Sequence, residues 1–190
     1  MTTFINADTV VGGAIVTADA SGEQALQSAG TTALTAASGN VSIANKMTVV
    51  GTSSTAGLKI ADVLETATAT TTAATGTINY DVTTQVVLFY TSNASANWTV
   101  NFRGSSGTSL NTLMATGESL TAAFLVTQGA TAYFNSAVQV DGTTSGVTTR
   151  WQGGTAPSAG NASGVDAYTY TIIKTANATF SVFAAQTRFA

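Results

Sequence analysis

The chain has 190 residues, of which only 8% are charged, and its formal net charge is −3. Ordinary soluble domains carry about 25% charged residues, so hydroxyl and amide groups must hydrate most of this surface. Such a surface suits packing against copies of the same chain or other subunits of an assembly, although an extracellular domain remains an alternative. The three lysines and three arginines are scattered singly, which argues against nucleic-acid binding.

Cysteine and histidine are both absent. Their absence excludes disulfides, Ser-His-Asp and Cys-His catalysis, and metal sites built on His or Cys ligands. No apolar run of about 18 residues occurs, so we expect no membrane span. The start, MTTFINADTVVGG, lacks the pattern of a secretory signal, and we expect none.

Short apolar pairs separated by Gly, Ser, Asn and Asp mark residues 1–56, for example Val10-Val11 and Ile15-Val16. Strands of so few residues form hairpins that are marginal alone in water, and their open edges need a partner. The pattern predicts an N-terminal attachment or shaft segment of short β-hairpins. The alternative is an arm that becomes ordered only when it docks.

The stretch SGNVSIANKMTVVGT, residues 38–52, predicts two very short strands joined by a polar turn. Its apolar residues Val41, Ile43, Met47 and Val49 have too few aromatic neighbours to form a core within one chain. Around a threefold axis each would meet its own copies, so we predict these four residues as the oligomer interface of a homotrimer. We expect Ile43→Asp to weaken trimerisation and leave the C-terminal part folded, and equal oligomer stability in the variant would contradict this interface.

Residues 57–76 predict a linker or an extended connector. The tract ETATATTTAATGT, residues 65–77, contains only small and β-branched side chains beside its one glutamate and is compatible with a flexible linker or an extended strand. Helix signals are weak throughout, and a single short helix in STAGLKIADVLETA, residues 54–67, is the less favoured alternative.

Fourteen of the 15 aromatic residues lie at or beyond Tyr80. Aromatic side chains dominate globular cores, so residues 77–190 should build a conventional core. Polar and apolar residues alternate there with the period of β-strands. The expected strands are 77–82, 84–91, 97–103, 119–128, 131–140, 166–175 and 178–187, the last two forming a hairpin near Asn177.

The alternation also predicts which side chains share a face. Ile78, Tyr80 and Val82 should share one face of their strand, as should Trp98, Val100 and Phe102. The fold class is therefore all-β, with a C-terminal two-sheet β-sandwich or jelly roll joined by Greek-key connections.

The nine acidic residues form no recognisable catalytic motif. Asp62 and Glu65 are close in sequence but lie in the aromatic-poor region, where a sugar cleft is least expected. Asp141 and Asp166 could serve calcium together with carbonyl groups, but the DxDxDG spacing is missing. We therefore interpret the acids as solvated or turn-capping residues and predict no catalytic residue, no metal and no cofactor.

A long surface loop is predicted for WQGGTAPSAGNASG, residues 151–164. Loops on a rigid β scaffold often carry recognition, which makes Trp151, Gln152 and Asn161 candidate recognition residues. An exposed Trp151 would stack on a sugar ring, whereas a buried Trp151 would anchor the loop.

Several stretches resemble structural proteins of bacteriophage virions. GNVSIANKMTVVGT, residues 39–52, resembles a short unit of the form GNVTIxxxLTVxGT that is frequent in phage tail fibres. FINADTVVGGAIVTADASG, residues 4–22, is similar to the N-terminal region of structural proteins from marine phages, including cyanophages. Residues 76–129 and 151–175 together resemble a C-terminal module of such proteins.

The resemblance implies a non-enzymatic virion component that is assembled in the host cytoplasm. It also implies a homotrimer with an N-terminal shaft and a C-terminal knob. The expected partners are other virion proteins of the capsid, neck or tail. One or two shaft repeats imply a stubby appendage, which raises the alternatives of a head fibre, capsid decoration protein or adaptor. A host surface glycan is a further possible partner. A carbohydrate-binding module and a glycan-cleaving depolymerase remain the alternatives from other classes.

Overall fold

The computed structural model describes residues 24–28, 31–37, 40–42, 47 and 63–190. The chain divides into two compact units, Met1–Asp62 and Val63–Ala190.

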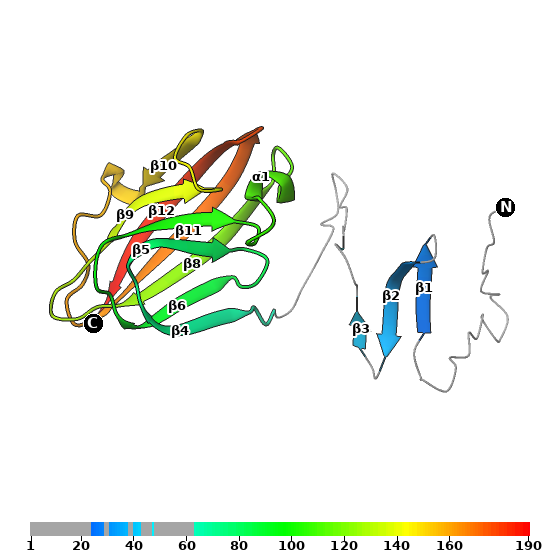
Figure 1. The fold of residues 1–190 in the computed structure, drawn as a ribbon, viewed down its shortest axis with the longest axis horizontal. Coiled ribbons are helices and arrows are strands. Elements are labelled where there is room, and N and C mark those ends of the chain that lie inside the picture. Colours follow the sequence, from blue (N-terminus) through cyan, green and yellow to red (C-terminus); the bar gives the residue numbers. More distant parts are fainter. Residues whose placement is uncertain (1–23, 29–30, 38–39, 43–46, 48–62) are drawn as a thin grey trace. The chain divides into compact units, whose positions relative to one another are not determined.

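Three short strands form a sheet of their own in the first unit. β1 (Gln24–Ser28), β2 (Thr31–Ala37) and β3 (Asn40–Ser42) pair antiparallel in the order β1-β2-β3 (Figure 1). Strands of three to seven residues agree with the short strands expected in this part of the chain.

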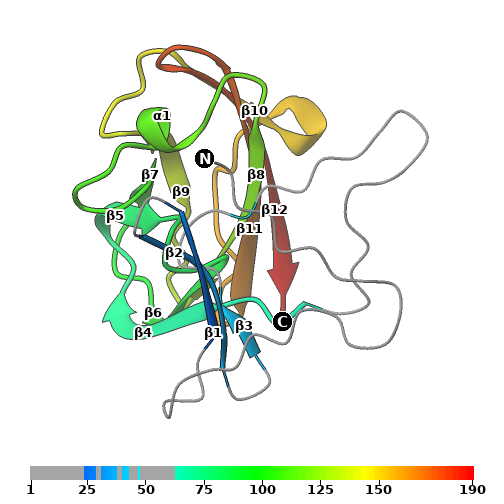
Figure 2. The ribbon, with the colours of Figure 1, turned by 90° about the vertical axis from the view of Figure 1, so that its right-hand side faces the viewer.

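The second unit holds nine strands in two sheets. Its elements are β4 (Ala67–Ala73), β5 (Gly76–Asp81), β6 (Val87–Asn93), β7 (Trp98–Arg103), the short helix α1 (Leu110–Leu113), β8 (Ser119–Thr127), β9 (Asn135–Val140), β10 (Val147–Trp151), a 3-10 turn η1 (Gln152–Gly154), β11 (Val165–Ala176) and β12 (Thr179–Phe189). One sheet has the order β10-β12-β11-β8-β6-β4 and the other the order β5-β7-β9. In Figure 2, β7 and β9 lie on one side of this unit and β8, β11 and β12 on the other.

From β4 to β9 the chain alternates strictly between the two sheets. Each return places the new strand parallel to the previous strand of that sheet, so β4, β6 and β8 are parallel neighbours, as are β5, β7 and β9. The chain therefore winds as a coil with one strand of each turn in each sheet. This pairing differs from the antiparallel neighbours that the expected Greek-key or jelly-roll connections produce.

The hairpin expected near Asn177 is confirmed. β11 and β12 pair antiparallel over their whole length, and β11 also pairs antiparallel with β8. The hairpin thus joins the last strand of the coil, and β10 adds to the far edge by pairing parallel with β12.

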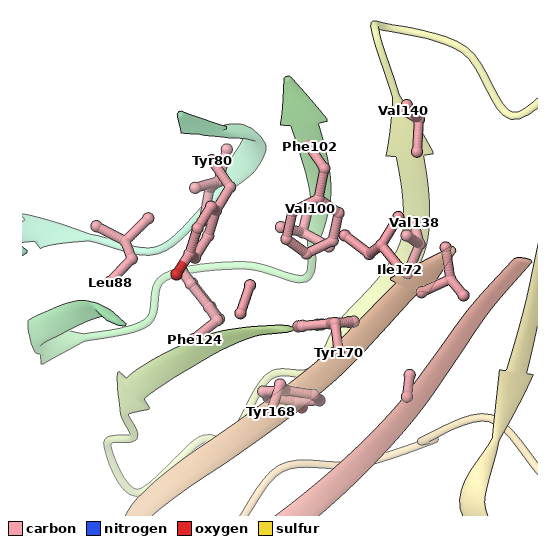
Figure 3. Packing of buried hydrophobic residues seen from close by; sticks show 14 of the residues in the cluster. Tyr80, Leu88, Val100, Phe102, Phe124, Val138, Val140, Tyr168, Tyr170 and Ile172 are labelled. Atoms are coloured by element: carbon pink, nitrogen blue, oxygen red, sulfur yellow. The ribbon is translucent and has the colours of Figure 1, made fainter. Parts of the chain in front are cut away.

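Aromatic side chains from both sheets meet in one core. The Trp98 and Tyr168 ring centroids lie 5.7 Å apart, and those of Phe102 and Tyr170 lie 4.9 Å apart, joining β7 to β11. Figure 3 shows Tyr80 and Phe102 on the same side of this core, facing the strand that carries Tyr170. The side chains that are almost fully buried include Trp98, Tyr80, Tyr168, Tyr170, Phe102, Phe124 and Leu110.

The predicted faces are confirmed in this unit. Trp98, Val100 and Phe102 are all buried, as are Ile78 and Tyr80, while Val82 packs partly against the core. Ala67–Ala73, in the tract that predicts a linker or an extended strand, forms strand β4. A short helix in residues 54–67 is the less favoured alternative. Residues 63–66 of that stretch have no regular structure, and residues 54–62 lie outside the described residues.

Candidate functional site

The loop after β10 is tied down by buried polar groups. Asp166 is fully buried, and its Oδ2 accepts hydrogen bonds from Gln128 Nε2 at 2.9 Å and from the Asn161 amide at 3.0 Å. Asn161 Nδ2 in turn donates to the Phe189 carbonyl at 2.8 Å. Asn161 thus links the loop to β11 and β12, and its amide group is engaged in that contact.

Trp151 stands at the base of the same loop and is half-buried. Its ring packs edge-on against Tyr168 and Tyr170, with both centroid distances 6.3 Å. Trp151 therefore anchors the loop to the core. Gln152, the next residue, is exposed.

A shallow hollow of about 320 Å³ lies on the outward side of the six-stranded sheet, beside the loop. Its lining includes Arg150, Trp151, Gln152, Thr169, Thr171 and Phe183. The Phe183 side chain is 47% exposed, and the Arg150 guanidinium carbon lies 5.9 Å from the centre of its ring. A second hollow of about 390 Å³ adjoins the first and shares Trp151 and Gln152 with it.

Arg150 is the cation of this hollow, and its charge has no polar partner in the described part of the chain. The other described cations are engaged: Arg103 Nε is 2.5 Å from Asp81 Oδ1, Lys174 Nζ donates to the Asn111 carbonyl at 2.6 Å, and Arg188 donates to the Ala159 carbonyl at 2.9 Å. An aromatic ring, a free guanidinium and threonine hydroxyls together suit a ligand with both a flat apolar face and an anionic or hydroxyl group.

Of the predicted recognition residues, the structure brings Trp151 and Gln152 together at this hollow and places Asn161 in a supporting contact. Sequence reasoning missed Arg150 and Phe183. The signal for Phe183 was present, because it is an aromatic residue on the polar phase of an alternating strand whose buried residues are Phe180, Val182 and Ala184.

Half of the predicted oligomer interface lies outside the described residues. Val41 lies in β3 and pairs with Ala36 of β2, and Met47 is 55% exposed. Ile43 and Val49 lie outside the described residues, so this interface stays a prediction.

Four of the five described acidic residues make structural contacts: Asp81, Glu118, Asp141 and Asp166. Asp141 accepts hydrogen bonds from the Leu110 amide at 2.6 Å and the Asn111 amide at 2.9 Å, and therefore caps α1. Asp81 pairs with Arg103, and Glu65 is exposed. No group of three potential metal ligands occurs among the residues that the structure describes. Asp62 lies outside the described residues.

Three buried tyrosines carry shifted pKa values. Burial raises the pKa of Tyr80 to about 12, a shift partly opposed by the hydrogen bond to the Ala123 carbonyl. Burial likewise raises the pKa of Tyr168 and Tyr170. These phenols remain protonated near neutral pH, as side chains of a core do.

The described residues define a mostly β protein with a three-stranded sheet in one unit and a nine-stranded, two-sheet second unit. Within them, no helix has the length and apolar character needed to cross a bilayer. Comparison with protein-family models, curated proteins and solved structures finds no match.

Proposed function

We propose that this chain is a non-enzymatic structural protein of a bacteriophage virion. It forms a short trimeric, fibre-like appendage whose C-terminal unit is an outward knob. The observation that carries the proposal is the division of the chain into a unit with strands of three to seven residues and a unit with a large aromatic core. The first suits attachment or a shaft, and the second suits a rigid terminal domain.

Two features support this proposal beside the resemblance of residues 4–22, 39–52, 76–129 and 151–175 to phage structural proteins. The second unit has two sheets with a hydrophobic core of buried side chains, and it carries an anchored loop and a hollow on its surface. The low charge of the chain suits permanent contact with neighbouring subunits.

Gold-labelled antibodies against the full chain, viewed by electron microscopy on intact particles, test this function. Label confined to short projections on tail or neck is the expected result. Label spread over the capsid would favour the alternative of a head fibre, decoration protein or adaptor. Particles without label, with the chain found only in the soluble fraction, would contradict a virion role.

The hollow beside Trp151 favours a second candidate function, carbohydrate binding by the knob. Phe183 supplies an exposed ring for stacking, and Arg150 supplies a guanidinium for a carboxylated or hydroxylated sugar. Glycan-array binding should be saturable and should be lost in Phe183→Ala. Trp151→Ala is a poorer probe, because its ring packs on Tyr168 and Tyr170. Binding that is equal in wild type and Phe183→Ala would contradict this candidate.

A further inference from the structure

The six-stranded sheet has an outward side that takes no part in the core. Between Ala122 and Val126 of β8 and between Asp166 and Lys174 of β11, even-numbered residues are buried and odd-numbered residues point outward, as strand pleating requires. The strand register places Val87 beside Ala123, Phe89 beside Leu125, and Leu125 beside Ala167. We call the continuous, partly exposed surface formed by Val87, Ala123, Leu125, Val165 and Ala167 the aliphatic face, and the aromatic ring of Phe89 adjoins it.

Charge is missing from the aliphatic face and its surroundings. Strands β4, β6 and β8 contain no charged residue at all. The two charged residues of β11, Asp166 and Lys174, are both buried on the opposite side of the sheet. The outward charge of this sheet is Arg150, on edge strand β10.

The outward side of the β5-β7-β9 sheet carries polar side chains instead. Asn101 Nδ2 donates to Asn79 Oδ1 at 2.8 Å, and Asn101 Oδ1 accepts from the Gly142 amide at 2.7 Å. The Arg103–Asp81 ion pair lies on the same side. One sheet thus turns amides and an ion pair outward, whereas the other turns Ala, Val, Leu, Phe and Thr outward.

The size of this uncharged surface matches a subunit interface. The strands β4, β6, β8 and β11 lie about 4.8 Å apart, and β8 extends about 30 Å over its nine residues, which gives roughly 600 Å². This area leaves out β12 and β10, which carry Phe183 and Arg150 of the hollow. One partner of a standard protein interface contributes about 600–1,000 Å².

We propose that the aliphatic face packs against the same face of other copies of this chain, so that the six-stranded sheets of three copies surround a common axis. Identical uncharged faces meet without like-charge repulsion, and the face offers no charge with which to select a different partner or a lipid headgroup. Its short side chains also permit close approach of sheets, which pack about 10 Å apart. This inference rests on the homotrimer of the proposed function, but it locates a contact in the second unit.

Sedimentation of the full chain at micromolar concentration tests the face. Leu125→Lys introduces a charge at its centre and should weaken trimer formation at least tenfold. The matched control is Thr77→Lys, at an exposed outward position on edge strand β5, which should sediment as the wild type does. Equal trimer stability in Leu125→Lys and Thr77→Lys would overturn the aliphatic face and leave the virion role untouched.

Cross-linking gives a readout that does not depend on the lysine variant folding. Because the chain contains no cysteine, Ala123→Cys introduces a single thiol on the face, and Thr77→Cys introduces one away from it. Mild oxidation should convert Ala123→Cys into disulfide-linked dimers and leave Thr77→Cys monomeric on a denaturing gel. A wild-type monomer in sedimentation, together with no cross-link in Ala123→Cys, would overturn both the face and the trimeric form of the appendage.

Discussion

At the scale of single residues, Tyr80 connects the two sheets. It lies on β5 of the small sheet, and its hydroxyl donates hydrogen bonds to the backbone carbonyls of Ala123, at 3.2 Å, and Val86. The phenol is buried with its ring 5.2 Å from that of Phe102. A single side chain therefore provides apolar packing and a polar contact across the core.

Stability should fall in alkaline solution because of this residue. Burial raises the pKa of Tyr80 from 10.0 to about 12, so the folded state favours the protonated phenol. The stabilisation is complete below pH 10 and is lost as pH rises from about 10 to about 12, since the unfolded chain releases its proton first. Urea unfolding midpoints measured between pH 7 and 11 should stay level and then decline.

The Tyr80→Phe variant separates this contribution from those of Tyr168 and Tyr170. It should be less stable than the wild type at pH 7 by about 1 kcal/mol, because its hydrogen bonds are lost. Above pH 10 its midpoint should decline less steeply than that of the wild type. Parallel declines would show that Tyr80 does not cause the alkaline loss.

At the scale of elements, α1 is a helix of four residues that its own sequence does not predict. Asp141 accepts from the Leu110 and Asn111 amides, and Ser109 Oγ accepts from the Thr112 amide at 3.0 Å. Lys174 Nζ donates to carbonyls at the other end, including that of Met114 at 2.9 Å. Residues distant in sequence thus supply most of the contacts that hold this turn.

Asp141→Ala should unfold α1 and lower the stability of the whole chain by about 1–2 kcal/mol, because two amides lose their acceptors. Asp141 also has a positive φ of 52°, which alanine adopts less readily than asparagine does. Asp141→Asn should therefore lose less than Asp141→Ala in thermal melts. An unchanged melting temperature in Asp141→Ala would contradict the capping role.

The sequence is sufficient to predict most strands of the second unit, because burial alternates along long parts of strands such as β8, β11 and β12. Tyr168, Tyr170 and Ile172 are a clear case: all three are buried, as the alternation predicts. The pattern does not predict α1, whose caps come from Asp141 and Lys174, or strand β10. Trp151 and Gln152, which line the hollow, are recognition candidates from the sequence because they lie in one predicted loop, and that role stays a prediction. Phe183 comes near them only through the pairing of β10 with β12, which the pattern does not predict.

At the scale of the whole molecule, the direction of strand pairing is the property that sequence alternation leaves open. A half-buried strand shows the same period of two in parallel and antiparallel neighbours. The pattern therefore gives two sheets but leaves open whether consecutive strands form hairpins or coil between sheets. The observed coil makes nearest neighbours of strands that are not consecutive in the chain.

The second unit should fold without the first. Val63–Ala190 contains the aromatic core and both of its sheets. A fragment of residues 63–190 should give a cooperative thermal transition within a few degrees of that of the full chain, measured by circular dichroism. A fragment with no cooperative transition would show that residues 1–62 are required for folding.

The coil also determines how strands could be added to such a protein. One turn consists of one strand in each sheet, and the coil starts at two edge strands, β4 in the large sheet and β5 in the small one. A tandem duplication that adds a strand pair ahead of β4 would extend both sheets in the same parallel direction and leave the β11–β12 hairpin undisturbed. Such a duplication would lengthen the coil by a whole turn and would retain the hollow and its loop at the opposite edge.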